Sequence, residues 1–189
     1  MQLFQLLENC KTAINAAIVD ALIDCSDYIA QIERTGRGDL PISGIALELF
    51  PWHSSLGLSL RSTNDFPAGE SRYDSADWEH FDFTNECDLP TIDNAIELMG
   101  ELYEMGRGDT FELTETAHLA FIAGAEALLL PNVCDTLNKL DVRAPKLSDS
   151  FVSSPFQYIV MDGDETVKSN YCDIVLANRV TQRLAPNAE

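Results

Sequence analysis

The chain of 189 residues is poor in cations. It has 12 Lys and Arg against 31 Asp and Glu, which gives a formal net charge of −19 at pH 7. A charge of this size repels nucleic-acid phosphates and anionic membrane surfaces, so we expect neither as a partner. A basic protein is the partner that the charge favours.

The sequence also lacks the common catalytic signatures. No Gly-x-Ser-x-Gly elbow occurs, and no glycine-rich phosphate loop follows a predicted strand. No cysteine lies in a basic or helix-start context that would lower its pKa. Only His53, His80 and His118 could supply an imidazole base. Nothing here argues for an enzyme, and we expect a non-catalytic protein without cofactor or metal.

Features of secreted and membrane proteins are missing too. The first residues, MQLFQLLENCK, have no basic region and no small-residue cleavage site, and no Asn-x-Ser/Thr sequon occurs. The most apolar stretch, residues 117–130, is too short to span a membrane. The cysteines are odd in number and without Cys-x-x-Cys spacing, which indicates free thiols in a reducing compartment. We therefore expect a cytoplasmic protein. The cysteines are Cys10, Cys25, Cys87, Cys134 and Cys172.

Hydrophobic periodicity, in contrast, is clear along most of the chain. Helical spacing from Leu3 to about Glu33 predicts one long helix or two abutting ones. Period-two alternation on both sides of a five-residue loop, residues 51–55, predicts an antiparallel hairpin over about 42–62. Further helices are predicted from Ile92 to about Met105 and at 115–130, 131–140 and 171–184, with a late strand at about 156–161.

The order of these elements predicts the fold class. Strands lie early and late in the chain, separated by helices, without the alternation of a doubly wound sheet. We expect a single α+β domain over residues 1–189, with a small and mainly antiparallel sheet packed by several helices.

The tetrapeptide Gly-Arg-Gly-Asp occurs twice, at 36–39 and at 106–109. Each copy follows an acidic segment with helical periodicity. A glycine that ends a helix, a basic residue near the carbonyl-rich end and an Asp in the next turn satisfy the capping preferences separately. We interpret both copies as helix stops rather than as adhesion motifs.

Glu115 and His118 have the Glu-x-x-His spacing of di-iron carboxylate sites. Those sites need two such motifs and two further carboxylates, and one motif is present, so a capping Glu and a partly buried His are favoured.

The turn Asp162–Glu165 and Asp173 partly match a calcium loop. However, Val167 stands where such a loop needs Gly, and Asp173 stands where a bidentate Glu is usual. A strand-to-helix turn with capping acids is favoured.

Acidic residues are concentrated in one region. Twelve acids lie from Asp65 to Glu104 with a single cation among them. On the predicted helix, Asp93, Glu97 and Glu101 stack at four-residue spacing opposite its apolar stripe. Like charges at this spacing cost roughly a few tenths of a kcal/mol per pair. A solvated face is the simpler interpretation, but an uncompensated cost is also what a surface for a cationic partner would show.

Aromatic residues interleaved with these acids favour the binding interpretation, because buried aromatics ringed by charge resemble binding hot spots. We therefore predict a partner-binding surface that combines the acids with two tryptophans. Its residues are Trp52, Asp77, Trp78, Glu79, Asp82, Asp93, Glu97 and Glu101.

The chain resembles a bacterial domain family. The hairpin segment ALELFPWHSSLGLSLRS, the segment YDSADWEHFDF with its Trp-Glu, the middle helix and the late strand FQYIVMDGDE carry the resemblance. Members of this family are found among immunity proteins of polymorphic toxin systems, and the family is similar in style to the SUKH-type immunity superfamily. The resemblance implies a cytoplasmic, non-catalytic protein that binds and blocks a cognate toxin.

Three hypotheses follow. The first is an immunity protein that holds a toxin with a basic domain through the acidic surface. The second is a metal-dependent hydrolase or other enzyme that uses Glu115, His118 and the turn Asp162–Glu165. The third is an acidic adaptor in a larger assembly.

Overall fold

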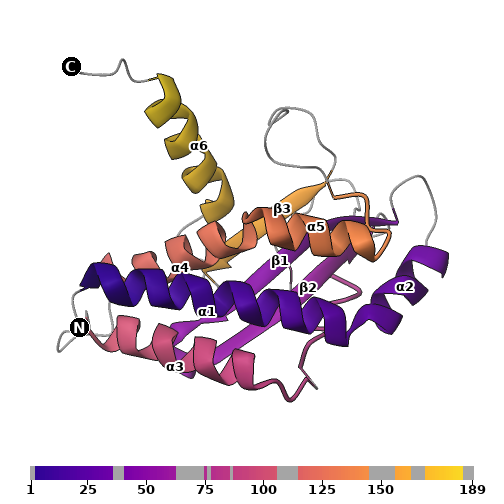
Figure 1. Ribbon diagram of the computed structural model, residues 1–189, viewed down its shortest axis with the longest axis horizontal. Coiled ribbons are helices and arrows are strands. Elements are labelled where there is room, and N and C mark those ends of the chain that lie inside the picture. The colour runs from indigo at the N-terminus through magenta and orange to yellow at the C-terminus, as the bar shows by residue number, and fades with distance from the viewer. Residues whose placement is uncertain are drawn as a thin grey trace.

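The computed structural model in Figure 1 describes residues 3–35, 41–62, 75, 78–85, 87–105, 115–144, 156–162 and 169–184. Its helices are α1 (Leu3–Asp24), α2 (Ser26–Thr35), α3 (Pro90–Glu104), α4 (Glu115–Leu128), α5 (Pro131–Lys139) and α6 (Tyr171–Leu184). Its strands are β1 (Ile42–Phe50), β2 (Ser55–Ser62) and β3 (Gln157–Asp162), and a short 3-10 turn, η1 (Pro51–His53), joins β1 to β2.

The predicted α+β class is confirmed, and the sheet is mixed. β1 and β2 form the expected antiparallel hairpin, with Leu47 opposite Leu58. β3 pairs with β1 in parallel, which gives the strand order β2-β1-β3. A parallel neighbour needs a long crossover, and here α3, α4 and α5 lie between β2 and β3 in the sequence.

One face of the sheet forms the main core under the helices (Figure 1). Ile45, Leu47 and Leu49 of β1 point to this face because successive strand side chains alternate. Gly124 of α4 lies directly over it: a Cβ atom at Gly124 would collide with the Leu49 side chain. The glycine therefore lets α4 lie close against β1.

The first predicted helical stretch is two abutting helices. α1 ends at Asp24 and α2 begins at Ser26, with Cys25 as a turn between them. Helical hydrogen bonding nevertheless continues through the break, since the Cys25 N–H donates to the Ala21 carbonyl at 2.9 Å. α1 packs against α3 and α4, and Figure 1 shows it running between them.

The segment after the hairpin lies along the free edge of β2. The Leu60 N–H donates to the His80 carbonyl at 3.1 Å, and the Phe83 N–H donates to the Leu58 carbonyl at 2.9 Å. Two side chains add to this attachment: the Ser59 hydroxyl accepts from the Asp82 N–H, and the Thr84 hydroxyl accepts from the Leu58 N–H, both at 2.9 Å. Pairing of this kind protects an edge strand from other chains.

α4 and α5 meet at a bend that α1 holds in place. The side-chain amides of Asn15 in α1 and Asn132 in α5 exchange two hydrogen bonds, of 3.1 and 2.7 Å. The Asn15 amide also donates to the Ala127 carbonyl at 3.1 Å. Among the described helices, none taken singly is both long and apolar enough to cross a membrane, and only the bent pair 118–128 and 131–139 passes that test when its two helices are combined.

Both Gly-Arg-Gly-Asp copies lie outside the described residues. The helices before them end where the sequence predicts, α2 at Thr35 and α3 at Glu104.

Candidate functional site

The outer side of α3 carries three exposed carboxylates, which we name the α3 acidic face: Asp93, Glu97 and Glu101. The opposite side of α3 buries Ala95 and Met99, and the helix packs on α1 at the flank of the molecule (Figure 1). α3 has no Lys or Arg, and none of the three carboxylates forms an ion pair with a cation elsewhere in the described part of the chain. Their charge therefore faces solvent uncompensated.

Trp52 lies next to the C-terminal end of α3. It sits on η1, is half-buried, and packs against Tyr103 of α3 with ring centroids 6.3 Å apart. Phe121 of α4 supports it from the core at 6.2 Å. The structure thus brings one of the two predicted tryptophans to the helix that carries the acidic face.

Trp78 lies elsewhere. It is 7% exposed and packs with Ala46 and Ile159 on the sheet face opposite the helices. Its neighbour Glu79 is exposed, while Asp77 lies outside the described residues. Trp78 therefore covers the second face of the sheet, and the structure separates it from α3.

Asp82 has a local packing role. It is half-buried, has a positive φ of 40°, and lies over Gly57 of β2. Its carboxylate accepts a hydrogen bond from the Thr84 hydroxyl at 3.3 Å. Burial raises the pKa of Asp82, and the bond from Thr84 opposes that rise.

The structure describes only some of the residues that a metal-dependent hydrolase or other enzyme would use. His118 is half-buried, and its Nδ1 lies 2.6 Å from the Tyr171 hydroxyl, while the Tyr171 ring stacks on Phe121. The side chains of Glu115 and Asp162 and the residues 163–165 lie outside the described set. His118 thus joins α4 to α6.

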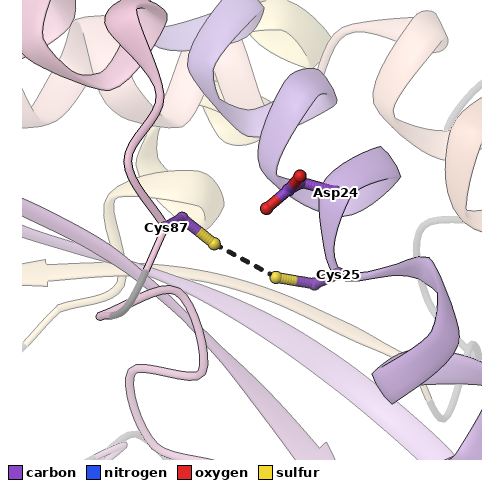
Figure 2. Close-up of side chains that lie close together, drawn as sticks. All are labelled: Asp24, Cys25 and Cys87. Carbon is purple, nitrogen blue, oxygen red and sulfur yellow. Dashed lines mark hydrogen bonds between the residues drawn. The ribbon is translucent and has the colours of Figure 1, made fainter.

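A second cluster, which the sequence analysis did not find, consists of Asp24, Cys25 and Cys87 (Figure 2). The two Sγ atoms lie 3.2 Å apart, and one donor atom from each of the three residues lies within 4.8 Å of the others. Burial raises the pKa of Cys87 to about 12, with smaller contributions from Cys25 and Asp24. All five cysteines are free thiols; these two are half-buried and the other three are buried.

No sequence signal marks this cluster, because 62 positions separate the two cysteines. Adjacent elements complete its surroundings. Tyr28 of α2 contacts His80 through a hydrogen bond of 2.9 Å and stacks on Phe83. α2 and the segment along β2 are therefore joined beside the thiols.

Comparisons with protein-family models, with curated proteins and with solved structures found no significant match.

Proposed function

We propose that this protein is a cytoplasmic inhibitor of the immunity type, which binds and neutralises a cognate toxin through the α3 acidic face without catalysis. The observation that carries the proposal is the exposure of Asp93, Glu97 and Glu101 on a helix without cations. Like charges four residues apart do not stabilise the folded protein. Binding of a cationic partner would explain their presence on α3.

The surroundings of the face support the same role. The net charge of −19 attracts a basic partner over distances beyond direct contact and raises its association rate. Half-buried Trp52 provides an aromatic surface at one end of α3, where apolar contact would slow dissociation. Charge then governs encounter, and the aromatic contact governs residence time.

The first test is capture of partners from the native cell lysate on three immobilised baits. These are the wild type, Glu97→Lys, and the matched control Asp27→Lys, which makes the same change of charge at an exposed acid on α2. We expect one stoichiometric partner with a basic toxin domain on the wild type and on Asp27→Lys, and much less of it on Glu97→Lys.

The second test measures association of that partner as a function of salt. Glu97→Lys should slow association steeply at low ionic strength and little at high ionic strength, because screening shortens the range of the charge. Capture of no partner, or equal capture and equal rates for both variants, would exclude the α3 acidic face as the binding surface.

A further inference from the structure

We propose that Asp24, Cys25 and Cys87 bind a thiophilic divalent cation of the Zn²⁺ class, with water in the fourth position. Two sulfurs and one carboxylate oxygen are donors that such ions prefer. In Figure 2 the three side chains converge from two segments, the end of α1 and the chain that leads into α3. This inference is independent of the proposed binding function.

The distances suit such a site after a small adjustment. A tetrahedral Zn²⁺ with Zn–S bonds of about 2.3 Å separates its two sulfurs by roughly 3.8 Å. The thiols of Cys25 and Cys87 are 3.2 Å apart, so a small change in side-chain torsions makes room for the ion. The carboxylate of Asp24 is already within 4.8 Å of both sulfurs.

The backbone around the cluster is held on both sides. The Ile29 N–H donates to the Cys25 carbonyl at 3.0 Å, which continues the helical bonding across the α1–α2 break. The Cys87 N–H donates to the Thr84 carbonyl at 2.9 Å, and Thr84 is itself bonded to β2. Donors held in this way lose little conformational freedom when an ion binds.

Access and charge also favour a cation. Asp24 is exposed and both thiols are half-buried, so an ion can enter from solvent. A bound divalent cation stabilises the two thiolates, and the carboxylate of Asp24 neutralises part of the cation's charge. Two metal–sulfur bonds form as two thiol protons leave to solvent, so binding should tighten as pH rises.

A redox pair of two thiols would explain why the two sulfurs lie close together, but not why the carboxylate of Asp24 lies beside them. A disulfide needs only the two sulfurs, whereas a carboxylate oxygen is an ordinary ligand of Zn²⁺. The presence of a third donor is what separates an ion site from a redox pair.

The test uses the full chain, reduced and free of oxygen, titrated with Co²⁺ as a spectroscopic probe and then with Zn²⁺. We expect one equivalent of Co²⁺ to give thiolate-to-metal charge transfer and the intense visible bands of a tetrahedral site. Zn²⁺ should remove these bands, and about two protons should be released per ion. No charge-transfer band at one equivalent of Co²⁺ would overturn the proposal.

Variants assign the ligands. Cys25→Ser and Cys87→Ser should each weaken Co²⁺ binding by at least roughly 100-fold, and Asp24→Asn by about tenfold. Asp27→Asn and Cys10→Ala are the matched controls, which remove an exposed carboxylate and a buried thiol that do not belong to the cluster. Affinity unchanged in Cys87→Ser would overturn the proposal, as would an equal loss in Asp24→Asn and Asp27→Asn. Thermal melts without metal show that each variant folds, and the wild-type titration stands alone if one does not.

Discussion

The carboxylate of Asp82 lies directly over Gly57, in the space that a Cβ atom at Gly57 would fill. Gly57 is the third residue of β2, and glycine is otherwise unfavourable inside a strand. The hydrogen bond from the Asp82 N–H to the Ser59 hydroxyl fixes the Asp82 backbone. A Cβ atom at position 57 would therefore force the Asp82 side chain to rotate away from the Thr84 hydroxyl that donates to it. The pair thus sets how closely the segment 78–85 approaches the edge of the sheet.

Gly57→Ala should therefore destabilise the fold by about 1–2 kcal/mol, as overpacking does in cores. Urea unfolding followed by circular dichroism measures this. The matched background is Asp82→Gly, which removes the carboxylate and accepts the positive φ. Gly57→Ala should cost little in that background, and an equal cost in both backgrounds would show that Asp82 is not the obstacle.

Asp82→Asn tests the charge at the same contact. Burial raises the folded-state pKa of Asp82 above its ordinary value of about 3.9, so its ionisation lowers the stability of the fold. The stability associated with the neutral carboxyl is complete below the unfolded-state pKa and is lost as pH rises through the folded-state pKa. Asparagine has nearly the same shape as aspartate and also tolerates a positive φ, but its side chain carries no charge.

We therefore expect the free energy of unfolding of Asp82→Asn, relative to wild type, to rise as the pH increases from below the ordinary carboxyl pKa of about 3.9 through the folded-state pKa of Asp82. Unfolding titrations across this range provide the measurement. A relative stability that falls with rising pH would contradict the assigned cause of the shift.

Local periodicity explains why most elements were predictable. The apolar stripes that predict α3 and α6 are properties of short segments, and packing preserved them. The parallel pairing of β3 with β1 was not predictable, because alternation in β3 shows which residues share a face but not which strand lies beside it. Register with a distant strand depends on the whole crossover.

The segment 77–83 illustrates a second limit. Its mixture of acids and aromatics resembles a binding surface, but Trp78 packs on Ala46 and Ile159 and Asp82 packs over Gly57. The glycine in β2 was the one local signal of a close approach. The Cys25–Cys87 contact had no such signal, since it joins a helix break to a loop.

Asn170 is the next residue whose removal should be costly. It is buried, and its side-chain oxygen accepts from the N–H groups of Cys172, at 3.1 Å, and Val160, at 3.0 Å. Its amide donates to the Tyr158 carbonyl at 2.8 Å. Asn170 therefore caps α6 and satisfies the outer edge of β3 with one side chain.

Asn170→Ala should lower the free energy of unfolding by about 2–4 kcal/mol, because it leaves buried backbone groups unpaired. Asn170→Ser keeps a hydroxyl that can cap α6 but cannot reach β3, so it should lose about 1 kcal/mol less. The exposed Asn178 of α6 is the control, and Asn178→Ala should stay within about 0.5 kcal/mol of wild type. Equal losses for the Ala and Ser variants at 170 would show that the cap contributes nothing.

We expect the α3 acidic face to lower the stability of the isolated protein slightly. Glu97 lies one turn from both Asp93 and Glu101, so Glu97→Lys replaces two repulsive pairs with two attractive ones. We expect the variant to be more stable by several tenths of a kcal/mol at low salt, with Glu97→Gln gaining about half as much. Thermal melts at low and high salt test this, since screening should reduce both gains.

A variant that is less stable than wild type at low salt would mean that the carboxylates serve the fold itself. A more stable variant that also loses its partner would show the opposite: the charges are kept for binding, at the expense of stability.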